Sequence, residues 1–202
     1  MNMKDYIGCK DFPCQDVDKK VYALPDISFN PKKIKILMIS EAPPNDLKDY
    51  FYTKGNPFYM ETTIKAFNDG GIKVTSIEDI INRSVYITTA IKCGKTGYSI
   101  AVDTLKNCSF ILEKELSYFP DIQCYLLMGD VAIKSLNSIA KRQTGARVIP
   151  AGSTYKIRKN KFFFKNKRVF PSYVMTGKNY LIEKSKRGMI ADDIKNAFQL
   201  IK

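Results

Sequence analysis

The feature that most constrains the fold is an alternation of short apolar runs with longer amphipathic segments. The short runs are rich in β-branched residues, which predicts buried strands, and the longer segments have the periodicity of helices. The predicted strands cover residues 34–40, 85–91 and 122–128, and the predicted helices cover 58–68, 100–119 and 130–140. Strand and helix in alternation are typical of a parallel sheet with helices on both faces. We therefore expect a three-layer α/β/α fold with a central, mainly parallel sheet of four to five strands, in one domain over residues 1–202.

The last third of the chain has a different pattern. Two short runs, 154–158 and 161–164, flank Lys159-Asn160, and this arrangement predicts a hairpin. Residues 168–171 would complete the sheet. Apolar residues at helical spacing predict a closing helix over 186–201.

Positive charge is concentrated in the same region. The net charge is +13, and residues 131–182 include twelve Lys and Arg but no Asp or Glu. A one-signed block interleaved with Phe and Tyr favours nucleic acid, because neutralising phosphates releases counterions. A solvated basic surface and a membrane-surface patch are the alternatives. The predicted nucleic-acid contacts are Lys156, Arg158, Lys159, Lys161, Lys165, Lys167, Arg168 and Tyr173.

The polar chemistry open to the chain is restricted by the absence of histidine. Nucleophilic schemes that use a Ser-His or Cys-His pair are excluded, and so are mixed Cys/His zinc sites. Residues 1–14 lack the apolar core of a signal peptide, so we expect a cytoplasmic protein that does not associate with membranes. In a reducing compartment the five cysteines are core residues, reactive thiols or metal ligands rather than disulfides.

Ligands of an open parallel sheet gather at the carboxyl ends of its strands. The loops that follow Ser40, Ala90 and Met128 are therefore the places where a site is expected. The first loop begins Glu41-Ala-Pro-Pro44, and the second passes through Lys92-Cys-Gly94.

Five segments together resemble, in order and spacing, the motifs of the family 4 uracil-DNA glycosylases, from about residue 9 to the C-terminus. Each segment corresponds to one family motif: the strand with Gly-Glu-Ala-Pro-Gly, the Pro-Phe loop, the strand with Asn-Ala-Val-Lys-Cys, the Leu-Gly-x-x-Ala turn and His-Pro-Ser. In this chain they are Ile36–Pro44, Asn56–Phe58, Tyr86–Cys93, Leu127–Ala132 and Phe170–Tyr173. The resemblance implies the uracil-DNA glycosylase fold, and a monomer that acts on DNA. It implies catalytic roles for Glu41 and Asn45, and base-binding roles for Ala42, Phe58, Thr89, Phe170 and Ser172.

Two of these positions depart from the family pattern. Thr89 stands where the family has the asparagine that reads uracil, and Phe170 stands where it has a histidine that donates to uracil O2. A phenyl ring cannot donate, and losing one donor to a developing charge costs about 100- to 1000-fold in rate. Slow or absent excision of uracil is therefore expected. For Phe58 a core role at a helix start is the alternative, and for Glu41 a capping or surface role.

The cysteines extend the resemblance. Family 4 enzymes hold a [4Fe–4S] cluster by four cysteines, and Cys9, Cys14, Cys93 and Cys108 stand in the corresponding places, although four residues separate the first pair where the family usually has two. An all-cysteine set suits iron–sulfur or zinc. Four unrelated buried thiols are the alternative, and Cys124 is expected to be a core residue within its strand.

The chemistry implied is extrusion of a base from the DNA stack and hydrolysis of its glycosidic bond. The leading hypothesis is a monofunctional DNA glycosylase acting on uracil or on another deaminated or damaged base. The rival hypothesis is a DNA-binding member of the same superfamily without catalysis. A third, weaker interpretation is a nucleotide- or RNA-binding α/β protein that uses the same basic surface.

Overall fold

The computed structural model describes residues 1–177, 180–181 and 183–201. Its strands are β1 Val17–Asp18, β2 Ile36–Ser40, β3 Val85–Thr89, β4 Gly94–Lys95, β5 Cys124–Met128, β6 Phe162–Phe164 and β7 Lys167–Ser172. Its α-helices are α1 Phe58–Asp69, α2 Ile77–Asn82, α3 Val102–Leu116, α4 Asp130–Thr144, α5 Thr154–Ile157 and α7 Lys184–Gln199. Short 3-10 helices cover Met3–Asp5, Lys19–Val21, Pro31–Lys33 and Leu47–Asp49. None of the helices in the described ranges is both long enough and apolar enough to span a bilayer.

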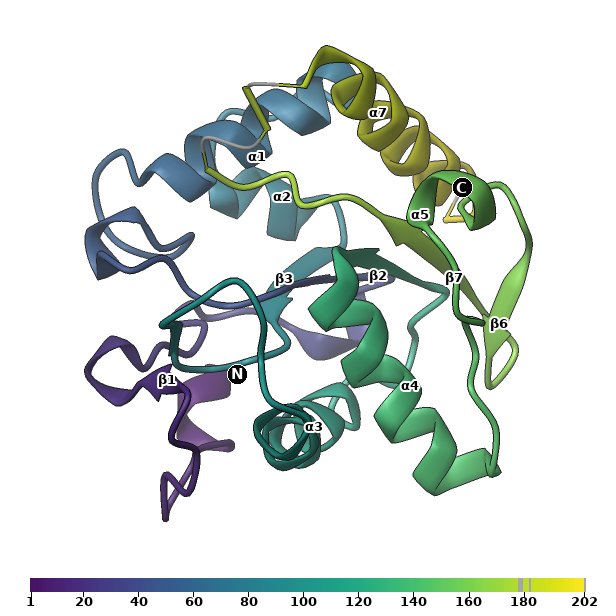
Figure 1. The fold of residues 1–202 in the computed structure, drawn as a ribbon. Helices are drawn as coiled ribbons and strands as arrows, with labels where there is room; N and C mark the ends of the chain where they lie inside the picture. Colours follow the sequence, from purple (N-terminus) through teal and green to yellow (C-terminus); the bar gives the residue numbers. More distant parts are fainter. Residues whose placement is uncertain (178–179, 182, 202) are drawn as a thin grey trace.

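The main sheet has five strands in the order β3-β2-β5-β7-β6. Strands β3, β2, β5 and β7 are parallel, and only the edge strand β6 is antiparallel to its neighbour. Figure 1 shows α1, α2 and α7 on one side of this sheet and α3 and α4 on the other. The predicted three-layer α/β/α architecture with a mainly parallel sheet of four to five strands is confirmed.

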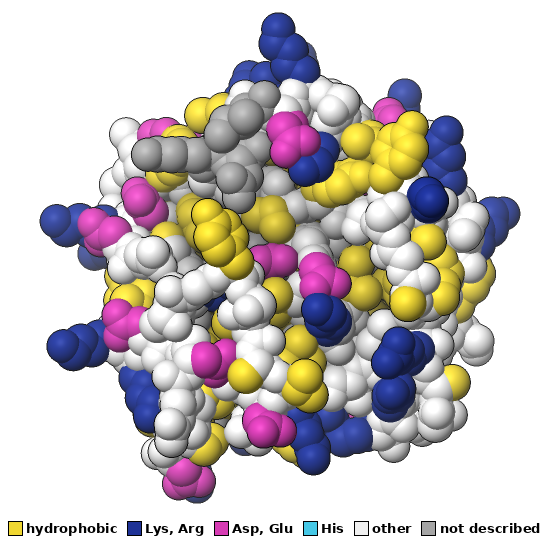
Figure 2. All heavy atoms as spheres, viewed as in Figure 1, with side chains coloured by type: hydrophobic (Ala, Val, Ile, Leu, Met, Phe, Trp, Pro, Cys, Tyr) yellow, Lys and Arg dark blue, Asp and Glu magenta, His cyan; other side chains and the backbone are white. Residues whose placement is uncertain are grey.

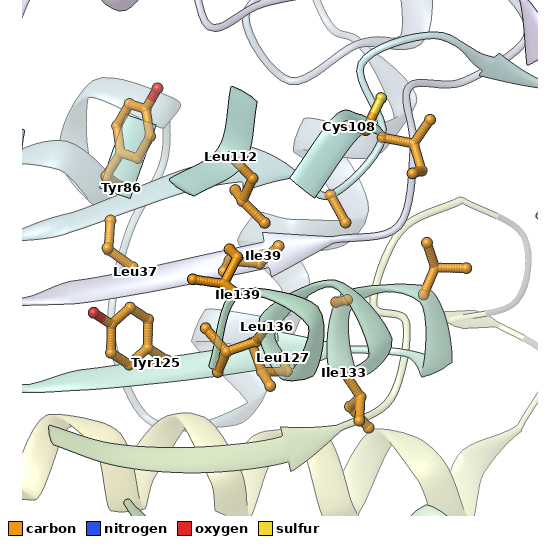
Figure 3. Close-up of a cluster of buried hydrophobic side chains, with 14 of the residues drawn as sticks. Leu37, Ile39, Tyr86, Cys108, Leu112, Tyr125, Leu127, Ile133, Leu136 and Ile139 are labelled. Carbon is orange, nitrogen blue, oxygen red and sulfur yellow. The ribbon is translucent and has the colours of Figure 1, made fainter. Parts of the chain in front are cut away.

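Successive side chains of each strand point to opposite faces of the sheet, and this produces two hydrophobic cores, one on each face. In β2, Leu37 and Ile39 face α3 and α4, whereas Ile36 and Met38 face the layer of α1, α2 and α7. Figure 3 shows the first of these cores, in which strand side chains such as Leu127 pack against those of the two helices. A strand that is buried on both faces has a continuous run of apolar residues. For this reason these strands could be predicted from the sequence.

The N-terminal segment joins the first core. Met3, Ile7, Val17 and Phe29 are buried there, and β1 pairs with β4 in a separate two-stranded sheet. This pairing places the segment beside the loop that follows β3 (Figure 1).

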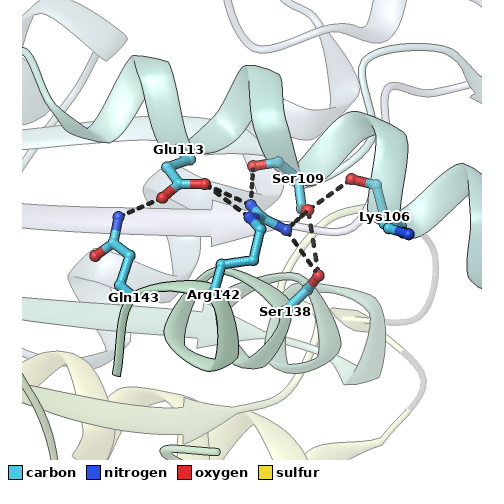
Figure 4. A network of polar contacts seen from close by, with 6 residues as sticks. All are labelled: Lys106, Ser109, Glu113, Ser138, Arg142 and Gln143. Atoms are coloured by element: carbon cyan, nitrogen blue, oxygen red, sulfur yellow. Dashed lines mark hydrogen bonds and ion pairs between the residues drawn. The ribbon is translucent and has the colours of Figure 1, made fainter. Parts of the chain in front are cut away.

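A polar network links α3 and α4, the two helices that cover one face of the sheet. The guanidinium of Arg142 on α4 donates to the carboxylate of Glu113 on α3, with the closest N–O distance 2.5 Å, and to the hydroxyls of Ser109 and Ser138 (Figure 4). Gln143 donates to the other oxygen of the same carboxylate. These contacts lie on the rim of the helix pair, away from the carboxyl ends of the strands.

The predicted hairpin lies elsewhere in the chain. Residues 154–157 form the short helix α5, and the hairpin consists of β6 and β7 around a turn at Lys165-Asn166. Both turn residues have positive φ, 48° and 63°, as a two-residue hairpin turn requires. The prediction of a turn at Lys159-Asn160 was therefore wrong, because the second Lys-Asn pair, not the first, adopts the left-handed conformation.

Candidate active site

A cleft of about 630 Å³ opens at the carboxyl ends of the parallel strands. Its wall comes from the loop after β2, the start of α1, the end of β4 and the segment after β7. The lining residues are Ser40, Glu41, Ala42, Pro43, Pro44, Asn45, Asp46, Asp49, Phe58, Tyr59, Lys95, Gly97, Val174, Thr176 and Gly177. Figure 2 shows acidic and basic side chains beside one another in the hollowed middle of the face drawn in Figure 1.

Glu41 is held in this cleft by contacts on both carboxylate oxygens. Oε2 lies 3.0 Å from Nζ of Lys95, and Oε1 accepts a hydrogen bond of 3.3 Å from the backbone N–H of Val131. Val131 belongs to the first turn of α4, so the carboxylate lies at the positive end of that helix. The side chain remains 21% exposed, which leaves it accessible to a ligand in the cleft.

Gly129 allows the carboxylate to lie so close to α4. A Cβ atom at this position would lie 2.5 Å from Glu41 Oε1 and 2.7 Å from Val174 Cγ2. Its φ of 99° is also one that L residues rarely adopt. The glycine of the strand-to-helix turn is therefore required by the position of Glu41.

Aromatic rings form another wall of the cleft. Phe58 and Tyr59 lie at the start of α1, where the Phe58 N–H is 3.4 Å from Asp49 Oδ1. Burial raises the pKa of the Tyr59 hydroxyl, so it remains protonated as a donor at neutral pH. A flat ring and a carboxylate facing one hollow are suited to hold a base and the sugar attached to it.

The structure brings four of the predicted site residues to the cleft, namely Glu41, Ala42, Asn45 and Phe58. Reasoning from the sequence missed Lys95, Tyr59, Asp46 and Asp49, which line it as well. Lys95 stands two residues after Cys93, in a loop that was already expected to hold a site. This position in the sequence could have identified Lys95 as a residue of the cleft.

The remaining predicted base-binding residues do not line the cleft. Thr89 pairs in register with Ser40 but is 0% exposed, and its side chain lies beside the buried hydroxyl of Tyr50. Phe170 is buried two residues before the end of β7, because the strand runs on to Ser172. Phe170 lies in the core on the α1 and α7 side, and Thr89 lies beside Tyr50 of the same core. Their contact with a base stays a prediction.

Ser172 and Arg158 belong to a buried polar cluster with Asp193. The Ser172 hydroxyl donates to Asp193 Oδ2 over 2.7 Å, and the Arg158 guanidinium contacts Asp193 Oδ1 at 2.7 Å. Burial raises the pKa of Asp193 to about 6, while the bonds from Ser172 and Arg158 lower it. Arg158 was predicted to contact DNA. In this structure its guanidinium is buried and paired with a carboxylate, and its contact with phosphate stays a prediction.

The other predicted DNA contacts are dispersed. Lys165 lies in the β6–β7 turn and Lys167 follows it, at the amino end of β7, opposite the edge that carries the cleft. Lys161 precedes β6, at the other end of that short strand. Lys156 and Lys159 are exposed on or just after α5, and Tyr173 is half-buried after β7. The Arg168 guanidinium lies 4.3 Å from the Phe170 ring centroid and donates to backbone carbonyls of its own hairpin region. Contact of these residues with DNA stays a prediction.

The four cysteines of the N-terminal segment, the loop after β3 and α3 line one small cavity. Cys9, Cys14, Cys93 and Cys108 share it with Phe12, Val17, Lys19, Tyr22, Lys92 and Ile111. Burial, together with the neighbouring Cys108, Cys9 and Cys14, raises the pKa of the Cys93 thiol to about 12. Over the described ranges, no group of three or more His, Cys, Asp or Glu side chains has the arrangement to hold a single metal ion. Cys124 is a buried core residue of β5, as predicted.

A buried ion pair lies between the cysteine cavity and the sheet. Lys92 and Glu115 are both 0% exposed, with Nζ and Oε2 2.6 Å apart. Lys92 also donates to the Thr88 hydroxyl and to the Thr89 carbonyl, and Glu115 accepts from Tyr86 and Thr88. The network fixes the loop that leads from β3 to Cys93.

Comparison with known proteins identifies one family. The model of the uracil DNA glycosylase superfamily matches residues 27–191, which includes the whole main sheet and every element that lines the cleft. A search of curated proteins found no match to the chain.

Proposed function

Because this chain belongs to the uracil-DNA glycosylase superfamily, we propose that it is a DNA glycosylase for a deaminated or damaged base. The observation that carries the proposal is the cleft at the carboxyl ends of the strands. It holds a fixed carboxylate, Glu41, opposite the aromatic wall of Phe58 and Tyr59. The protein hydrolyses the bond between the base and deoxyribose after the nucleotide leaves the stack.

Glu41 acts on the sugar side of this reaction. Breaking the glycosidic bond develops positive charge on the sugar, and a carboxylate held nearby stabilises that charge or orients the attacking water. Lys95 and the N-terminus of α4 keep the carboxylate in one orientation, so little reorganisation is needed. Phe58 stacks on the extruded base, and the exposed Asn45 amide on the same loop contacts the substrate.

The base is not read by the side chains that read uracil in family 4 enzymes. Thr89 is fully buried beside Tyr50 and does not line the cleft. Phe170 offers no donor and lies in the core. We therefore propose that uracil is a poor substrate and that backbone groups of the loop after β2 make the polar contacts to the base.

The direct test is base release from defined DNA. Labelled single and double strands carrying uracil, hypoxanthine or xanthine are incubated with the protein, and abasic sites are then cleaved with alkali. We expect strand cleavage for at least one modified base and little for uracil. If no strand is cleaved while the protein still binds DNA, the proposal of catalysis is wrong.

A non-catalytic DNA-binding member of the superfamily is the second candidate. The burial of both Thr89 and Phe170 favours it, because two positions that read the base in the family are unavailable. In that case Glu41 holds the loop after β2 against α4 as a structural contact. The assay above separates the two candidates.

We also propose that the four cysteines hold an iron–sulfur cluster. The support is that four thiols from three separate segments line one cavity with apolar Phe12, Val17 and Ile111. Each iron of a cluster takes one cysteine, so its ligands lie farther apart than those of a single ion. The cluster would tie the N-terminal segment to the loop after β3 and to α3, and it takes no part in the hydrolysis.

Anaerobically purified protein is expected to be brown and to contain iron and sulfide, with broad absorbance near about 400 nm. Replacement of Cys93 by Ser should reduce the iron content and lower the melting temperature, whereas replacement of Cys124 by Ser should leave the iron unchanged because Cys124 lies in β5. If the protein contained zinc in place of iron, the four cysteines would still be metal ligands, but the proposal of an iron–sulfur cluster would be wrong. If the protein contained neither iron and sulfide nor zinc, the proposals of a cluster and of a metal site at these cysteines would both be wrong.

A further inference from the structure

One amine in the cleft has only a positioning role in the hydrolysis described above, because it orients the Glu41 carboxylate. Lys95 ends the short strand β4, and its Nζ lies 3.0 Å from Glu41 Oε2. Its side chain is 22% exposed, so the amine can be reached from the cleft. Among the described residues that line the cleft, Lys95 is the one lysine.

The backbone holds Lys95 in place. Lys95 pairs with Val17 across the two-stranded sheet, and Gly94 packs so closely on Val21 that a Cβ atom would lie 2.9 Å from Val21 Cβ. The lysine is therefore presented from a fixed strand and not from a free loop. A positioned amine beside a carboxylate that can take its proton is the arrangement that Schiff-base chemistry uses.

We propose that Lys95 forms a Schiff base with the abasic deoxyribose, which makes the protein a lyase that cleaves DNA at abasic sites. The inference rests on the proposed function, because the cleft must admit the sugar of a nucleotide turned out of the helix. It adds a second reaction to the same site, and the substrate of that reaction is the product of base release.

The steps balance with the groups present. The ring-opened sugar carries an aldehyde at C1′. Glu41 takes a proton from the Lys95 ammonium, and the neutral amine adds to C1′. The resulting carbinolamine loses its oxygen as water, with a proton returned by Glu41, which leaves a protonated imine between Nζ and C1′.

Strand cleavage follows from this imine. Glu41, which has returned its proton and is again a carboxylate, takes a proton from C2′. The electron pair of that C–H bond moves toward the imine, and the bond between C3′ and its oxygen breaks. The 3′ phosphate group leaves with that oxygen, and water then hydrolyses the imine and releases Lys95. No oxidant, reductant or further reactant is needed.

Other amines near the N-terminal half are engaged elsewhere. The N-terminal amino group donates to the Phe29 carbonyl over 2.8 Å, and Lys92 is fully buried against Glu115. Lys48 is exposed on the 3-10 helix beside the cleft but does not line it. Lys48 therefore serves as the matched control.

Borohydride trapping on ready-made abasic DNA tests the inference. Borohydride reduces the imine to a stable amine, so the protein and the strand remain covalently joined. We expect a trapped complex and alkali-independent strand cleavage with the natural protein and with Lys48→Arg. Lys95→Arg keeps the ion pair with Glu41 but cannot form an imine, and its trapping should fall at least about tenfold at an unchanged melting temperature.

The outcomes separate this inference from the proposed function. Because the abasic site is supplied, trapping does not depend on base release by this protein. Base release without trapping would overturn the lyase and leave the glycosylase. Trapping without base release would support the lyase and reject the glycosylase. Trapping of Lys95→Arg at the level of the natural protein would overturn the assignment to Lys95.

Discussion

Replacing Lys92 by Met is expected to lower the free energy of unfolding by about 3–5 kcal/mol, because it leaves the Glu115 carboxylate buried without its cation. Both side chains are 0% exposed, and the 2.6 Å contact between Nζ and Oε2 is the only ion pair of Glu115 in the described ranges. Water cannot replace the lost partner at such a site. Denaturation with urea, followed by circular dichroism, measures the change.

A second substitution tests the cause. Glu115→Gln in the Lys92→Met background removes the unpaired charge and keeps an acceptor for the hydroxyls of Tyr86 and Thr88. The double variant should therefore be more stable than Lys92→Met alone, with a coupling energy of about 1–3 kcal/mol. Additive effects of the two changes would contradict the explanation by an unpaired charge.

An exposed ion pair provides the control. Lys134 and Asp130 lie one turn apart on α4, with side chains 61% and 69% exposed. Lys134→Met should change the free energy of unfolding by less than about 1 kcal/mol, because water screens such a pair. A loss for Lys92→Met as small as this would show that burial of the pair contributes nothing.

The strands and most helices could be predicted from the sequence because their burial produces local patterns. β2, β3 and β5 are buried on both faces, and their apolar runs mark them directly. The short helix α2 and the pair β1 and β4 were not predicted, because two to six residues give no clear period. The order of the strands and their register depend on packing between distant segments.

The sequence placed the loop residues at the cleft, whereas the strand residues do not line it. Glu41, Ala42 and Asn45 follow the end of β2, where any side chain of a short loop lies near the sheet edge. Thr89 and Phe170 lie within strands, where side chains alternate between the two faces and the end of the strand decides whether a residue reaches the sheet edge. A match between motifs does not fix that end.

The basic block shows a different limit. Its lysines and arginines are close in sequence, but the chain folds them onto α4, α5 and a hairpin that points away from the cleft. The partner of Arg158 is Asp193, 35 residues later and outside the block. The number of basic residues in this stretch of sequence is therefore larger than the number of cationic side chains that are available to bind phosphate.

The largest expected effect on activity comes from Glu41→Gln. Glutamine has nearly the same shape and retains an acceptor for the Val131 N–H, but it carries no charge and cannot take a proton. Loss of a carboxylate that stabilises the sugar or orients water should slow base release by about 100-fold or more. Single-turnover release of whichever modified base the natural protein excises measures the change.

The control is Glu113→Gln, because Glu113 is a partly exposed carboxylate that also pairs with a cation, Arg142, but lies on α3 outside the cleft. It should leave base release unchanged and affect only the link between α3 and α4. DNA affinity should not fall in either variant, since removing a negative charge does not weaken the attraction to phosphate. If Glu41→Gln released the base as fast as Glu113→Gln, the carboxylate would be a structural contact between the loop after β2 and α4, and the catalytic charge would have to come from Asp46 or Asp49, which line the same cleft.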